Sequence, residues 1–140
     1  MADYHKIGLI TLRGGRVLLC RKRTLTSKLI LPGGRVEAGE GALDCLAREL
    51  REELGAVEAA GVDYLGTYED RAASDDPTEH KTVEIVLYRG ALIGEPAPHS
   101  EIAELVWFGA EDDWDALSGI LVHKIFPDLI ARGVLPWSHA

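Results

Sequence analysis

Three glutamates at positions 49, 52 and 53 are the side chains in this sequence whose types and spacing are best suited to chemistry. On a helix, residues three and four positions apart lie on one face, so Glu49, Glu52 and Glu53 would present their carboxylates together. Like charges on one surface repel and stabilise nothing by themselves. Hard divalent cations such as Mg²⁺ prefer oxygen ligands, and enzymes commonly share Mg²⁺ with substrate phosphates. The spacing therefore predicts a metal site, with a merely solvated helix face as the simpler alternative.

The three glutamates belong to a longer pattern, Gly34-x5-Glu40-x7-Arg48-Glu49-Leu50-x-Glu52-Glu53-x-Gly55-Ala56, which specifies nine positions over 23 residues. Pro32-Gly33 directly precedes it. A chance match to so many positions is far rarer than an isolated pair of glutamates. In this pattern the sequence resembles the Nudix hydrolase family, whose signature is Gly-x5-Glu-x7-Arg-Glu-apolar-x-Glu-Glu-x-Gly-apolar. Every specified position of that signature is filled.

The resemblance implies an α/β fold, a Nudix-type α/β/α sandwich with a mixed β-sheet. It also implies a Mg²⁺- or Mn²⁺-dependent hydrolase of a nucleoside diphosphate linked to another group. The metal ligands that it implies are the Gly33 carbonyl and the carboxylates of Glu49, Glu52 and Glu53, with Glu49 acting either as a ligand or as the activator of water. Arg48 would orient a glutamate by a charge-assisted hydrogen bond. We interpret Glu40 as structural.

A divalent cation suits this chemistry because it neutralises the phosphates, polarises the P–O bond and lowers the pKa of a bound water. Family members often take one more carboxylate from a later loop, as a ligand or as the general base. We expect Glu104 in this role, with Glu101 as the alternative and Glu79 as a weaker third. The clustered glutamates should include at least one carboxyl group with a raised pKa in the metal-free protein.

Candidate substrate contacts come from the basic N-terminal segment. Residues 1–35 hold eight Lys or Arg and one Asp, although the whole chain has a formal net charge of −8, which argues against general nucleic-acid binding. Arg21 and Arg23 are the expected phosphate contacts, and exposed arginines at a strand end are the alternative. Tyr68 and Tyr88 could stack on a base, but packing is the favoured reading. Leu29 stands where many relatives carry an aromatic residue, so stacking from that position is not expected.

The expected partner is a small-molecule substrate, a nucleoside triphosphate, and this class includes oxidised nucleotides. ADP-ribose, nucleotide sugars and dinucleoside polyphosphates are the alternatives. Asp70 and Arg71 lie where ADP-ribose-cleaving relatives often carry a proline. An isomerase of isoprenoid diphosphates would need a cysteine-and-glutamate pair, for which Cys20 and Cys45 are poorly placed. A non-catalytic nucleotide-binding module would usually have lost a glutamate of the signature, and none is lost.

The elements that position these residues follow from hydrophobic periodicity. Strands are predicted at residues 7–12, 17–20, 29–31, 64–68, 82–92 and 104–108. Arg13-Gly14-Gly15-Arg16 predicts a hairpin turn, and Pro32-Gly33-Gly34 should end the third strand. If the second strand continues, Val17, Leu19, Arg21 and Arg23 share a face. Helices are predicted at 41–54, with a stripe of Leu43, Leu46, Ala47, Leu50 and Leu54, and at 114–125. Pro127 either kinks the second helix or opens a last short helix to residue 132. Residues 70–81 form a polar loop.

Length and composition are typical of one globular domain, residues 1–140, with 46% hydrophobic and 27% charged residues. No apolar run approaches the roughly 20 residues that span a membrane, and the polar residues 1–6 do not resemble a signal peptide. The two cysteines lack metal or redox spacing and are expected to be buried. We therefore expect a cytoplasmic protein without membrane association. Whether it forms a homodimer is left open.

Overall fold

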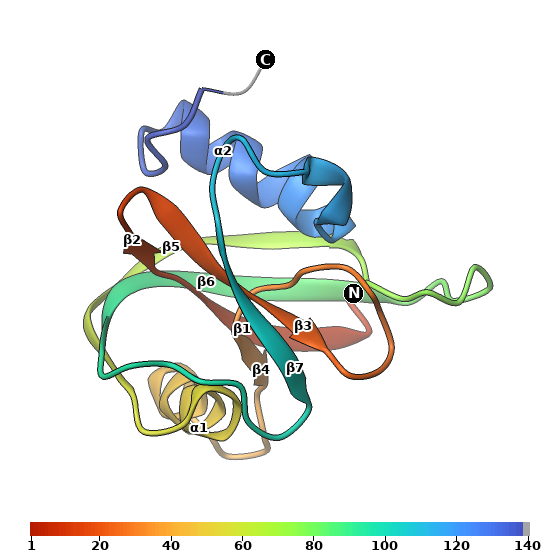
Figure 1. Ribbon diagram of the computed structural model, residues 1–140. Helices are drawn as coiled ribbons and strands as arrows, with labels where there is room; N and C mark the ends of the chain where they lie inside the picture. The colour runs from red at the N-terminus through yellow and green to blue at the C-terminus, as the bar shows by residue number, and fades with distance from the viewer. Residues whose placement is uncertain (139–140) are drawn as a thin grey trace.

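The computed structural model describes residues 1–138 (Figure 1). Its strands are β1 (Tyr4–Ile10), β2 (Leu12–Arg13), β3 (Arg16–Lys22), β4 (Gly33–Arg35), β5 (Glu58–Arg71), β6 (Thr82–Ile93) and β7 (Ile102–Phe108). Its helices are α1 (Ala42–Leu54) and α2 (Phe126–Ala131). A 3₁₀ turn at Trp114–Ala116 and a π-helical turn at Leu121–Ile125 lead into α2. None of the helices within residues 1–138 is long and apolar enough to cross a bilayer.

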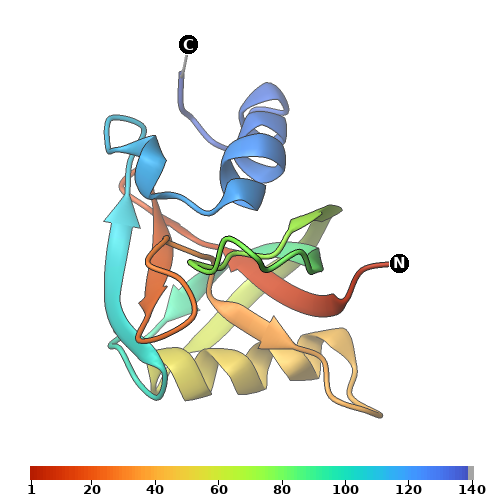
Figure 2. The ribbon, with the colours of Figure 1, turned by 90° about the vertical axis from the view of Figure 1, so that its right-hand side faces the viewer.

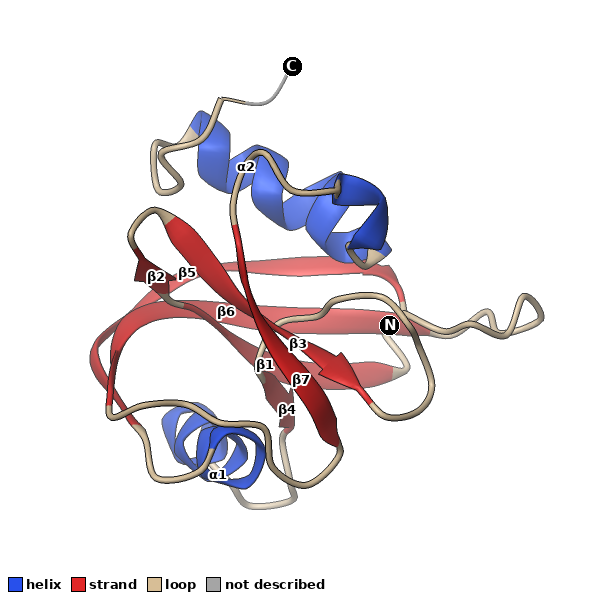
Figure 3. Ribbon diagram, in the orientation of Figure 1, coloured by secondary structure: helices blue, strands red, loops and turns tan. Residues whose placement is uncertain are grey.

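Two sheets form the middle of the molecule. One has the order β4-β1-β6-β5, with β1 and β6 parallel and the other neighbours antiparallel. The other has the antiparallel order β2-β3-β7. Helix α1 covers one side of these sheets and α2 covers the opposite side (Figures 2 and 3). The α/β/α sandwich with a mixed sheet is therefore confirmed.

Strand β3 runs between two apolar layers. Val17 and Leu19 pack in the cluster that contains α2, whereas Leu18 and Cys20 pack in the cluster that contains α1. Because successive side chains of a strand point to opposite faces, a strand covered on both sides carries a continuous apolar run. This burial fixes which faces the charged residues at the end of β3 can occupy.

The glycine-rich segment before α1 forms a strand rather than a turn. The predicted strand at 29–31 is wrong, since Leu29 and Ile30 make isolated bridges and the strand lies at Gly33–Arg35. Gly33 pairs with Gly8 of β1 and has φ +139°, and a Cβ there would lie 2.0 Å from the Ile7 carbonyl oxygen. Only glycine allows so close an approach. A sequence motif typical of turns is used here to bring two backbones together.

Helix α1 confirms the strongest helix prediction but not its buried stripe. Leu46, Leu50 and Leu54 are buried as expected, yet Leu43 is 54% exposed. Glu53 is buried with the apolar residues. The buried face is therefore rotated toward the glutamates, so the same side of α1 both packs and carries carboxylates.

The C-terminal end of α1 is held by the β6–β7 connection. Gly55 has φ +87° and its amide donates to the Arg51 carbonyl, which ends the helix. The His99 amide donates to the Glu53 carbonyl at 2.9 Å, and the Ala97 amide donates to the Leu54 carbonyl at 3.0 Å. A Cβ at Gly55 would lie 2.6 Å from His99 Nε2. The signature glycine at this position therefore leaves room for a loop that fixes the end of the glutamate helix.

The predicted second helix is only partly correct. Its first residues form a 3₁₀ turn at Trp114–Ala116, and Leu117 forms a bridge to Leu29 instead of continuing a helix. Pro127 lies in the first turn of α2, directly after the π-helical turn in which the Phe126 amide donates to the Leu121 carbonyl. The result is a helical segment that begins just after Ser118, beside Leu29.

Candidate functional site

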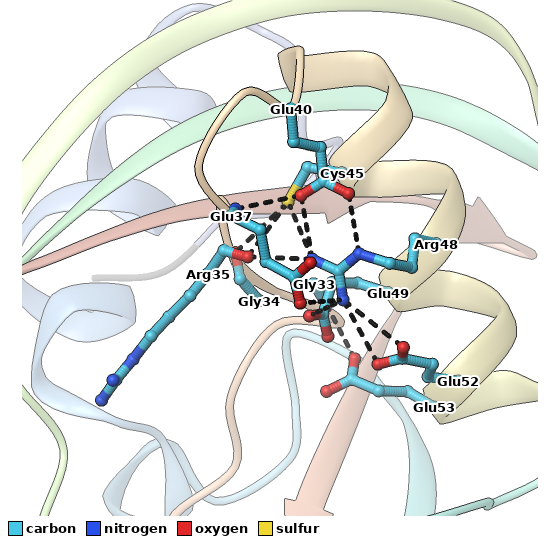
Figure 4. Close-up of polar contacts among 10 residues, drawn as sticks. All are labelled: Gly33, Gly34, Arg35, Glu37, Glu40, Cys45, Arg48, Glu49, Glu52 and Glu53. Atoms are coloured by element: carbon cyan, nitrogen blue, oxygen red, sulfur yellow. Dashed lines mark hydrogen bonds and ion pairs between the residues drawn. The ribbon is translucent and has the colours of Figure 1, made fainter.

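Helix α1 places two of its glutamates against the glycines of β4 (Figure 4). The Gly33 amide donates to Glu53 Oε1 at 2.9 Å. A Cβ on Gly34 would lie 2.3 Å from the carboxyl carbon of Glu49, so a larger residue there would displace that carboxylate. The glycines of the signature therefore let the backbone lie directly against the carboxylates.

Arg48 is the centre of a charged network on the same face of α1 (Figure 4). Its guanidinium donates to both oxygens of Glu40, at 2.7 and 3.0 Å, and to Glu49 Oε1 at 2.8 Å. It also donates to the Arg35 carbonyl at 3.1 Å and lies 3.4 Å from Glu52. Such bidentate pairs are directional and hold side chains in one geometry. The charge-assisted hydrogen bond expected from Arg48 to a glutamate is thus present, and Glu40 holds the Arg48 guanidinium.

Burial perturbs the acidity of the carboxyl groups. Burial raises the pKa of Glu53 to about 7, the Gly33 hydrogen bond opposes this, and the charge of Glu49 adds to it. Burial also raises the pKa of Glu49, although Arg48 opposes the shift. The hydrogen bond from Arg48 instead lowers the pKa of Glu40 to about 2. Two carboxyl groups at one place are therefore costly to ionise without an added positive charge.

The chemistry of this donor set fits a divalent cation. Glu49 and Glu53 are crowded, partly desolvated oxygen donors that lie against the backbone of the glycine strand. Within residues 1–138, no three acidic, histidine or cysteine side chains converge closely enough to form a metal cluster. Glu52 is 53% exposed and is held by Arg48. A bound cation would recover the energy lost by ionising Glu49 and Glu53 in a desolvated place.

Gly33 and Gly34 also line a cavity. The side nearest β4 carries the cations Lys6, Lys22 and Arg35. The side formed by β6 and the segment before α2 is apolar, and its lining includes Leu31, Val83, Ile85, Ile120 and Leu121. A cavity with one cationic and one apolar side suits an amphipathic ligand that has an anionic part and a flat apolar part.

Two connections form the rim of the cavity. Leu25 is 68% exposed with φ +77°, and its carbonyl accepts from the Asp75 amide at 2.9 Å. The Asp75 carboxylate in turn accepts from the Ser27 amide at 3.0 Å. The segment after β3 and the connection between β5 and β6 are thus joined by hydrogen bonds at Asp75.

The cations of the cavity are not those predicted. Lys22 continues the face of Leu18 and Cys20 toward the glutamates, whereas Arg21 lies on the other face. Lys6 lies on β1 opposite Arg35 of β4. Burial lowers the pKa of Lys6 to about 8, and the charges of Lys22 and Arg35 add to this effect. No sequence signal distinguishes Lys22 from Arg21, because the apolar run before them indicates burial on both faces.

Arg21 and Arg23 do not line the cavity. Arg21 Nε donates to Glu104 Oε1 at 2.5 Å across the β3–β7 pairing and also contacts the Ser27 carbonyl. Arg23 lies beyond the end of β3, so the expected shared face does not extend to it, and its Nε donates to the Ser100 carbonyl at 3.3 Å. Both arginines therefore engage neighbouring parts of the chain.

The three candidates for an additional carboxylate occupy different places. Glu104 is paired with Arg21 on β7, and Glu101 lies in the connection that precedes β7. Glu79, the weakest candidate from the sequence, lines the cavity, and Glu101 and Glu104 do not. The structure thus brings together Gly33, Glu49, Glu53 and Arg48, and it holds Glu104 with Arg21 instead.

The remaining candidates pack. Leu29 is buried in the α2 cluster and does not line the cavity. Tyr68 packs there too, and its hydroxyl donates to Asp128 Oδ2 at 2.5 Å. Cys20 and Cys45 are buried and free, as expected. Burial raises the pKa of the Cys45 thiol to about 11 and the pKa of Cys20 further still, which keeps both as neutral thiols.

The family model of the NUDIX domain matches residues 6–119. The chain belongs to the Nudix family. Nudix hydrolases generally use divalent metal ions. The match includes the glutamate helix, β4 and nearly all of the cavity lining.

Sequence relatives of this Nudix-family chain include the NAD-capped RNA hydrolase NudC. The protein from Pseudomonas aeruginosa is 35% identical over 112 residues, which are 75% of this chain and 35% of that protein. The protein from Pseudomonas putida W619 is 45% identical over 62 residues, 44% of this chain and 22% of that protein. The chain thus spans about a third of the length of the curated relatives it matches, or less.

Solved structures share the Nudix fold at lower identity. The MutT NUDIX hydrolase from Burkholderia pseudomallei superposes with a TM-score of 0.70 at 24% identity, covering 83% of this chain and 90% of that one. The ORF135 protein of E. coli superposes with a TM-score of 0.71 at 24% identity, covering 99% and 96%. These similarities establish the fold.

Proposed function

We propose that this Nudix hydrolase is a Mg²⁺- or Mn²⁺-dependent nucleoside triphosphate pyrophosphohydrolase. Water would attack a phosphorus of the triphosphate, and a nucleoside monophosphate and pyrophosphate would leave. The observation that carries this proposal is the cavity beside Gly33 and Gly34, with cations on one side and apolar residues on the other. Oxidised nucleotides belong to the same substrate class.

The cationic side supports a substrate with several phosphate charges. Lys6, Lys22 and Arg35 line it, and no ion pair within residues 1–138 neutralises any of the three. Arg35 lies over the Tyr4 ring at 4.2 Å, which orients its side chain. An extended polyphosphate could contact several of these cations while its scissile phosphate faces the glutamates.

The residue roles in this proposal start from the glutamate helix. Glu49, Glu52, Glu53 and the Gly33 carbonyl would hold the cation, which would neutralise the phosphates and activate water. Arg48 would keep Glu49 oriented through their 2.8 Å hydrogen bond. An additional carboxylate from Glu104 stays a prediction without geometric support, and the cavity position of Glu79 favours Glu79. The phosphate contacts proposed for Arg21 and Arg23 likewise lack support, and Lys6 and Lys22 are better placed.

NAD-type dinucleotides are the second candidate substrates. They are favoured by the 35% identity to NudC of Pseudomonas aeruginosa over most of this chain. A dinucleotide diphosphate carries fewer phosphate charges than a triphosphate, so it would use less of the cationic side. Substrate preference therefore separates the two candidates directly.

The test is a substrate panel assayed for pyrophosphate, phosphate and nucleoside monophosphate release in Mg²⁺ and in Mn²⁺. The panel contains nucleoside triphosphates with their 8-oxo forms, NAD, ADP-ribose and dinucleoside polyphosphates. Glu53→Gln should abolish metal-dependent cleavage. Glu58→Gln is the matched control, because Glu58 is an exposed residue of β5 that pairs with Arg51.

Lys6→Met tests the cationic side of the cavity. Loss of one charge-assisted contact should raise KM for a triphosphate about 10-fold or more, and the effect should be smaller for NAD. Lys124→Met, which removes an exposed lysine from the π-helical turn, is the control. Preferential cleavage of NAD, or a KM for triphosphates that Lys6→Met leaves unchanged, would reject the triphosphate proposal.

A further inference from the structure

Lys6 is a primary amine on an inner strand of the four-stranded sheet. Its strand β1 lies between β4 and β6, so Lys6 has Arg35 as its antiparallel partner on one side and Ile85 as its parallel partner on the other. Directly paired residues of neighbouring strands share a face of the sheet, and all three of these residues line the cavity. The Lys6 side chain therefore lies between a guanidinium group and an apolar side chain.

These surroundings favour the neutral form of the Lys6 amine. No ion pair within residues 1–138 joins Lys6 to a carboxylate. Burial is the main cause that lowers the pKa of Lys6 to about 8; the charges of Lys22 and Arg35 act in the same direction, and those of Glu53 and Glu49 oppose them. Desolvation and neighbouring cations are the two means by which proteins activate a lysine as a nucleophile, because only the neutral amine has a free electron pair. Lys6 has both.

The rest of the cavity determines which electrophile would reach this amine. Lys22 and Arg35 can hold an anionic group, and the Tyr4 ring orients Arg35 at 4.2 Å. Val83 and Ile85 form an apolar wall that suits the face of a flat carbon skeleton. A small carbonyl compound with a phosphate group matches both features, since its phosphate would pair with the cations while its carbonyl carbon faces Lys6.

We propose that Lys6 is a covalent modification site for small, flat aldehydes that carry a phosphate group. The ε-amine attacks the aldehyde carbon, and a C–N bond forms. Both protons of the neutral amine leave with the carbonyl oxygen as water, and a C=N double bond, an imine, remains. The step consumes no oxidant or reductant, and water reverses it. It goes beyond the proposed function, because it requires neither a metal ion nor a triphosphate substrate, and the adduct would block the cavity.

The experiment labels the protein with pyridoxal phosphate in EDTA at pH 8, reduces the imine with borohydride and measures the labelled fraction of each lysine by peptide mass spectrometry. The exposed Lys124 of the π-helical turn is the internal control. Lys6 should react about 10-fold faster than Lys124 or more. Pyridoxal, the same aldehyde without the phosphate, should label Lys6 about 10-fold more slowly. Inorganic pyrophosphate should protect Lys6 but not Lys124.

Two controls separate the effect of the cavity from general amine reactivity. Lys6→Arg keeps the positive charge but removes the amine, so the fast label should disappear without moving to Lys22, and labelling of Lys124 should not change. The wild type in urea should react at similar rates at Lys6 and Lys124, because the selectivity comes from the fold. The comparison of folded and unfolded wild type is decisive even if the variant does not fold.

Three results would overturn the proposal. They are equal labelling rates of Lys6 and Lys124 in the folded protein, a preference for Lys22, and equal labelling of Lys6 by pyridoxal phosphate and pyridoxal. If the wild type cleaves no triphosphate but Lys6 is labelled selectively, the proposed function fails and the modification site stands. Cleavage of triphosphates without selective labelling would reject the modification site alone.

Discussion

Glu53→Gln should stabilise the metal-free protein while it inactivates the enzyme. Glu53 is 8% exposed and its pKa is raised to about 7 from an ordinary value of 4.5. Between these pH values the unfolded chain releases its proton first, so raising the pH favours unfolding. Above pH 7 the difference amounts to about 3 kcal/mol. Glutamine removes this penalty, and its amide oxygen can still accept the hydrogen bond from Gly33.

The assay is urea unfolding in EDTA at pH 4 and at pH 8. At pH 4 both states hold the proton, so Glu53→Gln and the wild type should have similar free energies of unfolding. At pH 8 the variant should be more stable by about 3 kcal/mol. The exposed Glu58→Gln should show no such gain, and saturating Mn²⁺ should stabilise the wild type but not Glu53→Gln. Equal stability of Glu53→Gln and the wild type at pH 8 would refute the burial argument.

Three further predictions concern the same helix. Gly34→Ala should lower kcat about 100-fold in steady-state assays, because the new Cβ would lie 2.3 Å from the Glu49 carboxyl carbon and would displace that carboxylate. An unchanged kcat would mean that the Glu49 carboxylate can move freely. The Kd for Mn²⁺, measured by calorimetry, should rise as the pH falls from 8 to 5. The reason is that protons compete with the metal for Glu53 and Glu49, whose pKa values are raised. An affinity for Mn²⁺ that does not change between pH 8 and pH 5 would exclude these carboxylates as ligands. Leu50→Ala should destabilise the protein by about 2–5 kcal/mol in urea unfolding, because Leu50 is fully buried against the sheets; a loss below that range would mean that the helix repacks.

The glutamate helix could be predicted because its evidence is local. Spacings of three and four residues place Glu49, Glu52 and Glu53 on one helical face, and Gly55 marks the helix end. The contacts of Arg48 with Glu40 and Glu49 lie within the same short segment. Local periodicity could not show that Leu43 is exposed, since this depends on which part of the sheet α1 covers.

The cavity could not be predicted because it depends on pairing between distant segments. Lys6 meets Arg35 through the β1–β4 pairing, and Ser118 approaches through its bond to Leu29. Alternation along β3 indicated Arg21 rather than Lys22, because a strand buried on both faces gives no polar face to choose. The residues that the sequence missed are those that come together only through pairing between distant segments.

The two connections near the site differ in how freely they could diversify. The one that contains Ala97 and His99 is hydrogen-bonded to the last turn of α1, so a change in its length would shift Glu53. The 72–81 connection is instead hydrogen-bonded at Asp75 to the segment after β3. Exchange of residues in that connection other than Glu79 could alter what the cavity admits without changing the hydrogen bonds that hold the end of α1. The fold thus separates a part open to modular variation from a part whose length is fixed.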